Sequence, residues 1–133
     1  MMSERRYPAP EPNAETQVFW DAAGKGVLKI KNCRACFRAH YYPRAICPHC
    51  GSDKTEWVIS EGAGEIYSVS VMRRGEGAPF AVAYVTLDEG PAVLTNIVDC
   101  DPDSLTIGQR VRIAFKPSEE GAPPVPTFTP SGD

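Results

Sequence analysis

The sequence lacks any long apolar run. The longest, FAVAYV from Phe80, is far too short to span a bilayer, and residues 1–15 contain no apolar segment typical of a signal peptide. Internal repeats are absent, and with 42% hydrophobic and 23% charged residues the composition is that of an ordinary globular protein. We therefore expect a cytoplasmic protein with one folded core and no membrane segment.

Catalytic signatures are missing too. The chain has only two histidines, and it contains no H-E-x-x-H, G-x-S-x-G, Walker-type or G-x-G-x-x-G motif. The segment EGAGE at 61–65 is better explained by a turn or bulge at the start of a strand. Cys100 has no obvious histidine partner in the sequence, and a lone cysteine usually behaves as a small hydrophobe. We therefore do not expect an enzyme that acts on its own.

Four of the five cysteines form two C-x2-C pairs separated by ten residues, at Cys33, Cys36, Cys47 and Cys50. In a reducing compartment, such pairs are better explained by a metal than by disulfides. Each C-x2-C pair with the residues that follow it forms a tight turn, called a zinc knuckle. The first knuckle carries Cys33 and Cys36 and the second carries Cys47 and Cys50, and together they place four thiolates in a tetrahedron that suits zinc. The mononuclear iron of a rubredoxin uses the same ligands, so the sequence favours zinc without excluding iron. A closed shell of four thiolates leaves no position for water or substrate, which predicts a structural metal.

Basic residues are concentrated around these cysteines, although the formal net charge of the chain is -3. Residues 25–54 contain seven basic side chains and one acidic side chain, a local charge of +6, which four thiolates on a divalent metal would reduce to about +4. The rest of the chain has seven basic and 16 acidic side chains. A basic patch on an acidic protein indicates a small anionic ligand more than a long polyanion.

The N-terminal part is expected to be a flexible arm followed by a short helix. Residues 1–12 contain three prolines and no periodic apolar pattern. Asn13 can then cap a helix in segment 13–24. Phe19 and Trp20 are expected on different sides of this helix, so that at least one of them contacts the barrel, the ribbon or another chain.

The remainder is expected to form a zinc ribbon at 25–56 and a barrel at 57–130. Short segments with apolar alternation follow the cysteines, and in the first of them Tyr67 and Val69 are expected on one face. A proline-rich tail would add a short fifth edge strand at 125–128. Five short strands with glycine-containing turns in about 70 residues predict an OB-fold rather than a sandwich.

Histidines and tyrosines between the cysteine pairs have alternative roles. His40 is expected in a loop and His49 at a solvated knuckle position, neither of them as a metal ligand. Tyr41 and Tyr42, followed by Arg44, can stack on a base and pair with a phosphate. With equal weight, the tyrosines can instead pack the ribbon against the barrel.

The order of these segments resembles a known family. A helix containing FW precedes NCRACF, YYPRAICPHCGS, GAGEIYSVSVM, VTLDEGP, LTIGQRVRIAF and PPVPTFTP, over roughly residues 14–130. This order is similar to that of the acyl-CoA-associated OB-fold proteins catalogued as domain of unknown function 35, or DUF35. The resemblance implies a mainly β chain with a short N-terminal helix, a rubredoxin-like zinc ribbon and a C-terminal five-stranded OB-fold barrel.

The resemblance also implies a function. Family members look like accessory subunits of thiolase-like enzymes, either thiolases or the aldolases that shorten steroid or aromatic side chains as CoA thioesters. A thiolase-like or sterol-carrier-type thiolase/aldolase partner would supply the catalytic residues in a hetero-oligomer. This chain would stabilise the partner, cover its active-site entrance or help to hold the acyl-CoA. All four cysteines match the family pattern, as do Pro43 and Arg44, whereas Phe37 stands where a glycine often follows the second cysteine and predicts a slightly different turn.

CoA carries phosphates and an adenine, which suit a basic and aromatic surface. The candidate residues for contacts with CoA or the partner are Arg38, Tyr41, Tyr42, Pro43, Arg44, Phe19 and Trp20. An alternative function is a single-stranded nucleic-acid-binding module, because zinc ribbons and OB barrels commonly bind single strands. A free-standing thioesterase would need a nucleophile–base pair, and none is visible.

Overall fold

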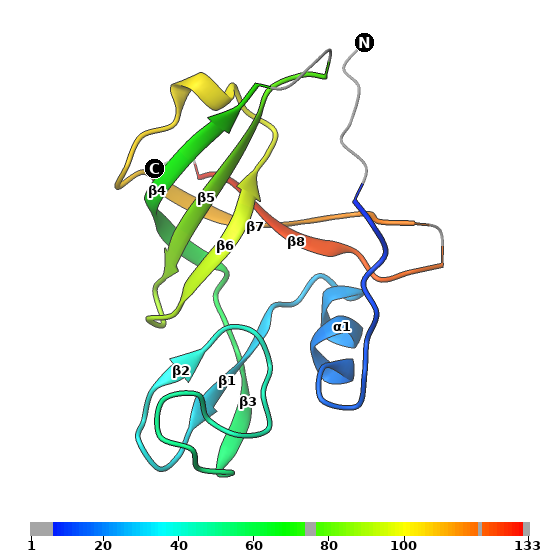
Figure 1. Cartoon of the computed structure of the whole chain (residues 1–133), viewed down its shortest axis with the longest axis vertical. Coiled ribbons are helices and arrows are strands. Elements are labelled where there is room, and N and C mark those ends of the chain that lie inside the picture. Colours follow the sequence, from blue (N-terminus) through cyan, green and yellow to red (C-terminus); the bar gives the residue numbers. More distant parts are fainter. Residues whose placement is uncertain (1–6, 74–76, 120, 132–133) are drawn as a thin grey trace.

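Most of the regular structure is β-strand, as predicted (Figure 1). The computed structural model describes residues 7–73, 77–119 and 121–131. Within these ranges, no helix combines the length and apolar character needed to cross a membrane. The elements, in chain order, are α1 (Gln17–Ala23), β1 (Lys29–Cys33), β2 (Ala39–His40), β3 (Thr55–Ile59), β4 (Ala63–Met72), β5 (Phe80–Leu87), β6 (Ala92–Ile97), the 3-10 helix η1 (Pro102–Ser104), β7 (Arg110–Lys116) and β8 (Val125–Pro130).

The ribbon is a three-stranded antiparallel sheet with β1 at its centre. β1 pairs with β3 along its whole length, from Lys29 opposite Ile59 to Cys33 opposite Thr55, and with β2 on its other side. Because Trp57 belongs to β3, the ribbon sheet extends past the expected boundary between ribbon and barrel.

The remaining five strands form the predicted barrel, which is closed in the order β4-β5-β6-β8-β7 by pairing of β4 with β7. One strand lies elsewhere than expected. β8, predicted as an edge strand, lies between β6 and β7; it pairs with β7 along its length and with β6 where Phe128 stands opposite Ile97. Phe128 is fully buried. The proline-rich tail therefore closes the barrel instead of forming its edge.

A bulge in β4 changes which residues face the core. The register with β5 shifts between Ile66 and Ser68, so Tyr67 is an extra residue on β4. Tyr67 is 70% exposed, whereas Val69 packs against the core. The expectation that these two residues share a face is wrong, because one additional residue reverses the alternation.

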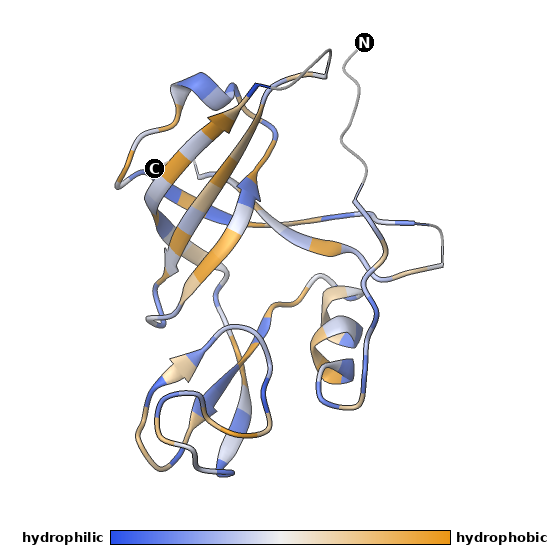
Figure 2. Cartoon of the chain, in the orientation of Figure 1, coloured by the Kyte–Doolittle hydropathy of each residue, from blue (hydrophilic) through white to orange (hydrophobic). Residues whose placement is uncertain are grey.

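One hydrophobic cluster joins the helix, the ribbon and the barrel, and Figure 2 shows the apolar residues in all three. Helix α1 begins at Gln17, later than expected, because residues before it form a turn in which the Asn13 side chain accepts a hydrogen bond of 3.0 Å from the Thr16 N–H. Phe19 and Trp20 are both buried in this cluster, where at least one of them was expected to pack, and their rings meet edge to face at 4.9 Å.

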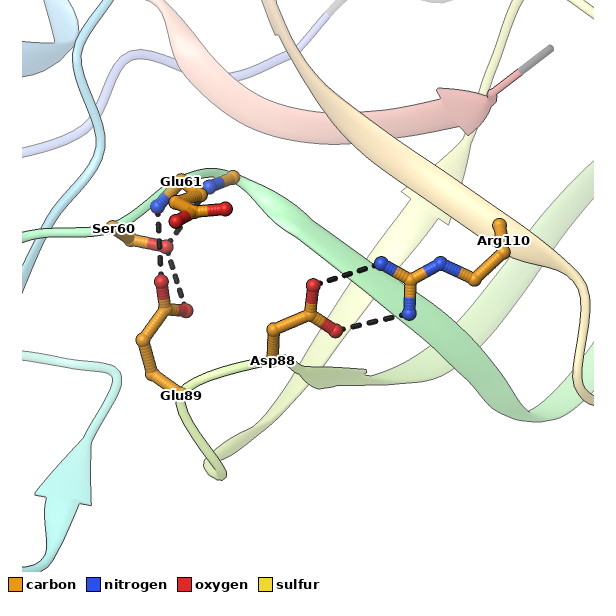
Figure 3. Close-up of polar contacts among 6 residues, drawn as sticks. Ser60, Glu61, Asp88, Glu89 and Arg110 are labelled. Carbon is orange, nitrogen blue, oxygen red and sulfur yellow. Dashed lines mark hydrogen bonds and ion pairs between the residues drawn. The ribbon is translucent and has the colours of Figure 1, made fainter. Parts of the chain in front are cut away.

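The linker between ribbon and barrel is held by the turn between β5 and β6 (Figure 3). In this turn, the Glu89 carboxylate accepts hydrogen bonds from the Ser60 hydroxyl and the Glu61 N–H, each at 2.9 Å. The adjacent Asp88 carboxylate accepts two bonds of 2.9 and 2.8 Å from the Arg110 guanidinium, which lowers the pKa of Asp88. One turn thus contacts both the linker and the start of β7.

Candidate metal centre and surrounding surfaces

Two knuckles bring the four cysteine sulfurs together. All four Sγ atoms lie within 4.8 Å of one another, with 3.6 Å between Cys33 and Cys50 and 3.7 Å between Cys36 and Cys47. These separations are much longer than a disulfide bond of about 2 Å. Four sulfurs bound to one zinc at about 2.3 Å lie about 3.8 Å apart. The four side chains therefore fit the tetrahedral thiolate site that their spacing predicts.

Backbone donors favour the thiolate form. The N–H groups of Ala35 and Cys36 donate to the Cys33 sulfur at 3.3 and 3.4 Å, and the His49 N–H donates to the Cys47 sulfur at 3.3 Å. The hydrogen bond from the Cys36 N–H is the largest single cause of a lowered Cys33 pKa. Burial raises this pKa, but all contributions together bring it down to about 6. The Ala35 and Cys36 donors stabilise the negative charge on the Cys33 sulfur that a metal ligand requires. Burial acts in the opposite direction and, together with the neighbouring cysteines, raises the pKa of Cys36 and of Cys50.

Neither histidine belongs to this cluster. His49 lies between the last two ligands, with its Nε2 atom 3.3 Å from the Ala39 carbonyl oxygen. His40, expected in a loop, lies in β2 and is only 6% exposed, and its ring nitrogens have no hydrogen-bond partner in the described part of the chain. Burial lowers the pKa of His40, so its ring is uncharged at neutral pH.

The aromatic candidates pack against the helix. The Tyr41 ring lies 5.7 Å from the Phe19 ring and the Tyr42 ring 5.8 Å from it, measured between centroids. Burial raises the pKa of Tyr41 above its usual value, whereas Tyr42 is partly exposed. Both tyrosines thus pack the ribbon against α1, and Tyr41 also packs against the core cluster that includes barrel residues. Of the four aromatic candidates, Tyr42 has the most accessible ring.

The basic candidates are exposed. Arg38 and Arg44 both lie on the surface, whereas Pro43 between the tyrosines and Arg44 is buried. The loop that carries Arg44 is tied to the segment before α1, because the Ala45 N–H donates to the Glu15 carboxylate at 2.6 Å. The two arginines are therefore available to an anion or a partner, while Pro43 shapes the loop.

A recess of about 490 Å³ separates the ribbon from the turn between β5 and β6. Phe37, Arg38 and His49 border it on the ribbon side, and Pro91 and Ala92 border it on the barrel side. Sequence patterns did not predict this recess, because its two walls come from segments about 50 residues apart that are brought together only in the folded chain.

The outer face of the barrel displays apolar side chains with almost no charge. β4, β5 and β6 together contain one charged residue, Glu65, and they expose the side chains of Tyr67, Tyr84 and Leu94. Ser68 stands opposite Tyr84. Sequence analysis did not identify this surface, although the scarcity of charge over three consecutive strands is the signal that marks it. Such composition is typical of protein interfaces and differs from that of phosphate-binding grooves.

No acid–base or nucleophilic pair forms within the described ranges. Burial first, and then the charges of Asp101 and Asp99, raise the pKa of Cys100, which keeps it a thiol at neutral pH. His40 has no hydrogen-bond partner and His49 contacts a backbone carbonyl. What the described residues do bring together is a four-thiolate metal site and exposed surfaces.

Comparison with known proteins agrees with this architecture. The family model described as "ChsH2, rubredoxin-like zinc ribbon domain" matches residues 20–56, and "ChsH2, C-terminal OB-fold domain" matches residues 57–116. Because the ribbon match includes all four cysteines and their sulfurs are close enough to share an ion, the chain has one structural zinc site.

Two relatives differ in how much of their length is matched. The DUF35 domain-containing scaffold protein of Methanothermobacter thermautotrophicus is 41% identical over 101 residues, which cover 71% of this chain and 76% of the relative. The probable enoyl-CoA hydratase alpha subunit of Thermomonospora curvata is 35% identical over 108 residues, which cover 78% of this chain and 34% of the relative. The chain thus spans about a third of the length of the second relative.

Solved structures show the same fold. A chain of the Ltp2-ChsH2(DUF35) aldolase superimposes with a TM-score of 0.76 at 32% identity, covering 91% of this chain and 98% of that one. A DUF35 protein of unknown function from Sulfolobus solfataricus has the same fold at 15% identity, with a TM-score of 0.66 and coverage of 90% and 87%. The chain belongs to the DUF35 family, with a ChsH2-type zinc ribbon and OB-fold.

Proposed function

We propose that this chain is a non-catalytic accessory subunit of a thiolase-like enzyme, a thiolase or a retro-aldolase, that cleaves or forms C–C bonds in acyl-CoA thioesters. The observation that carries the proposal is the 32% identity, over 98% of its length, with a chain of the Ltp2-ChsH2(DUF35) aldolase. The relatives named scaffold proteins support a role in binding other proteins. The partner would supply the catalytic residues, and we expect the complex in the cytoplasm.

Hydratase names among the relatives do not change this proposal. This chain matches 34% of the Thermomonospora curvata hydratase subunit and 35% of the Mycobacterium tuberculosis 3-oxo-4,17-pregnadiene-20-carboxyl-CoA hydratase alpha subunit. We assign hydratase chemistry to the unmatched two thirds of those proteins, because the matched part here has a closed thiolate site and no nucleophile–base pair among its described residues. Steroid or other bulky acyl-CoA thioesters are the substrate class we propose for the complex.

Within the complex, we propose that Arg38, Tyr42 and Arg44 help to hold CoA. The two arginines are exposed and able to pair with phosphate, and the accessible ring of Tyr42 can stack on adenine. Arg44→Ala is expected to weaken binding of a CoA thioester to the assembled complex by about tenfold, or about 1.4 kcal/mol. Arg112→Ala removes an exposed arginine from the barrel and serves as the matched control. Unchanged affinity in the Arg44 variant contradicts the contact.

The alternative of a single-stranded nucleic-acid-binding module is disfavoured by the barrel surface. A groove for a phosphate backbone needs lysines or arginines beside its aromatic residues, whereas β4, β5 and β6 carry only the acidic Glu65. Retention of the purified chain on heparin or single-stranded DNA at moderate salt would support this alternative. The accessory-subunit proposal predicts that the chain elutes early.

The decisive experiment is co-expression of the chain with a thiolase-like protein from the same organism. The complex is purified through a tag on this chain, and C–C cleavage of acyl-CoA is assayed with and without the chain. We expect a stable complex whose activity depends on this chain. Failure to retain a thiolase-like protein, or acyl-CoA hydrolysis by the chain alone, contradicts the proposal.

A further inference from the structure

The two knuckles of the metal site share a backbone conformation but differ in one side chain. In the first, the Phe37 N–H donates to the Cys33 carbonyl at 2.9 Å; in the second, the Gly51 N–H donates to the Cys47 carbonyl at the same distance. In both, the N–H of the first cysteine donates to the carbonyl five residues later, at 3.0 and 2.8 Å. The first knuckle therefore turns as the second does, although it lacks the glycine.

Both turns require a left-handed backbone. The φ angle is 61° at Phe37 and 80° at Gly51. Glycine adopts this conformation readily, whereas a Cβ atom clashes with the neighbouring backbone, and bulky residues are genuine outliers there. The turn places both sulfurs of the knuckle, so Phe37 is held in a conformation that its own side chain disfavours.

The Phe37 side chain gains no compensating burial within the chain. It is 80% exposed, the highest value among the exposed large hydrophobic side chains in the described ranges, and it lies outside the hydrophobic core cluster. Single exposed hydrophobic residues are common and need no explanation. An exposed aromatic ring on a strained backbone, at a position where glycine would fit without strain, is different, because both features are unfavourable in the isolated chain.

Exposed basic residues accompany Phe37 on the first knuckle. Arg34 and Arg38 lie on the same knuckle and are exposed, and the exposed Lys54 is adjacent because its carbonyl accepts a hydrogen bond of 2.8 Å from the Arg34 N–H. Asp53, next to Lys54, is the one acidic residue of segment 25–54. An aromatic side chain on a knuckle with two exposed arginines is complementary to an apolar pocket with carboxylates at its rim. Aromatic and arginine side chains also dominate the energetics of protein interfaces.

We propose that Phe37 is an anchor residue that inserts into an apolar, carboxylate-rimmed pocket on a folded protein subunit. This inference rests on the proposed function, since the subunit in question is the thiolase-like partner, and it identifies the first zinc knuckle as the surface that binds it. Burial of the ring in the complex would offset the strain at Phe37, and the surrounding cations would accelerate association.

Variants of Phe37 separate this role from a structural one. Phe37→Gly is expected to keep one zinc per chain and to unfold at the same or a higher temperature, because it relieves the backbone strain. It is nevertheless expected to bind the thiolase-like subunit at least tenfold more weakly in calorimetry.

Phe37→Asn should behave in the same way, because asparagine tolerates the left-handed backbone. Phe37→Leu should retain more affinity, because leucine is apolar. Ile107→Ser, which removes an exposed apolar side chain from the barrel, should bind as the wild type does.

The outcomes distinguish this inference from the proposed function. Wild-type affinity in the Gly and Asn variants overturns the anchor while leaving the accessory-subunit role intact, because the complex still forms. A lower unfolding temperature or loss of zinc in Phe37→Gly would assign Phe37 a structural role and likewise overturn the anchor. Absence of any complex with the wild-type chain overturns the proposed function itself.

Discussion

At the scale of single residues, His40 links the stability of the ribbon to pH. Burial in β2 is the largest cause of its lowered pKa, and the positive charges of His49, Lys31 and Arg44 act in the same direction. The Arg44 backbone lies close enough to the ring to oppose them, but no hydrogen bond of acceptable geometry forms. Because the folded-state pKa lies below the unfolded value of about 6.5, the unfolded chain binds more protons between these two values. The contribution of His40 is therefore fully present above about pH 6.5 and is lost as the pH falls towards the folded pKa.

Chemical unfolding of the zinc-loaded chain between pH 7.5 and 5.5 tests this linkage. We expect the free energy of unfolding of the wild type to fall more steeply with decreasing pH than that of His40→Phe, which has no group to protonate. At pH 7.5 the variant should be at least as stable, because it removes two buried ring nitrogens that lack partners in the described structure. Parallel pH profiles for the two proteins would show that His40 is not the titrating group.

At the scale of elements, the zinc ribbon depends on its metal more than the barrel does. The ribbon sheet has three short strands, one of only two residues, whereas the barrel is closed and has its own buried strands. Small sheets of this kind need a metal or another cross-link for stability. Zinc removal by a chelator at neutral pH should accelerate amide hydrogen exchange in β1 and β3 while β5 remains protected.

Metal analysis identifies the ligands in the same experiment. The wild type should bind one zinc per chain, and Cys36→Ser should lose it, since three thiolates and a hydroxyl bind zinc far more weakly. Cys100→Ser is the matched control, because Cys100 lies outside the sulfur cluster, and it should retain zinc fully. Zinc retained at full stoichiometry by Cys36→Ser would contradict the four-thiolate site.

Local sequence patterns predicted which segments form helices and strands better than they predicted which strands pair with each other. The five barrel strands and the short helix could be recognised because each has its own apolar pattern or turn residues. In EGAGE, by contrast, the need for Gly64 comes from a neighbouring strand, since a Cβ there would lie 2.4 Å from the Thr86 carbonyl oxygen of β5. The outward position of Tyr67 and the closing position of β8 depend on register with other strands, which no single segment encodes.

The same division applies to the site. Cysteine spacing predicted the metal ligands because a knuckle is a local structure with its own geometry. The helix pattern predicted that Phe19 or Trp20 packs against another part of the chain, but not which part, because the contacts of Phe19 with Tyr41 and Tyr42 join segments that are more than 20 residues apart. Phe37 in the place of a glycine predicted a slightly different first turn, and this prediction is wrong, because the turn has the same hydrogen bonds and left-handed backbone as that of Gly51.

At the scale of the whole molecule, the orientation of the ribbon on the barrel depends on a small junction. The linker follows β3 directly and enters β4 through Gly62, whose N–H donates to the Ser60 hydroxyl at 3.0 Å. That hydroxyl in turn donates to Glu89, so one carboxylate of the β5–β6 turn fixes the linker conformation (Figure 3). The recess lies at this junction, because Glu89 borders it, and the exposed knuckle forms its wall on the ribbon side. An accessory subunit that contacts its partner through both parts requires them to be held in a fixed orientation.

Glu89→Ala tests whether this carboxylate holds the junction. We expect hydrogen exchange at the Glu61 amide to accelerate at least tenfold, because its acceptor is removed, while zinc content and protection of β5 remain unchanged. The matched control is Asp88→Ala, which removes the adjacent carboxylate and its bonds to Arg110 but leaves the Glu61 acceptor in place. If the linker orients the two parts for the partner, the Glu89 variant should also bind the thiolase-like subunit more weakly than the Asp88 variant does. Equal exchange at Glu61 in both variants would mean that the linker holds its conformation without Glu89.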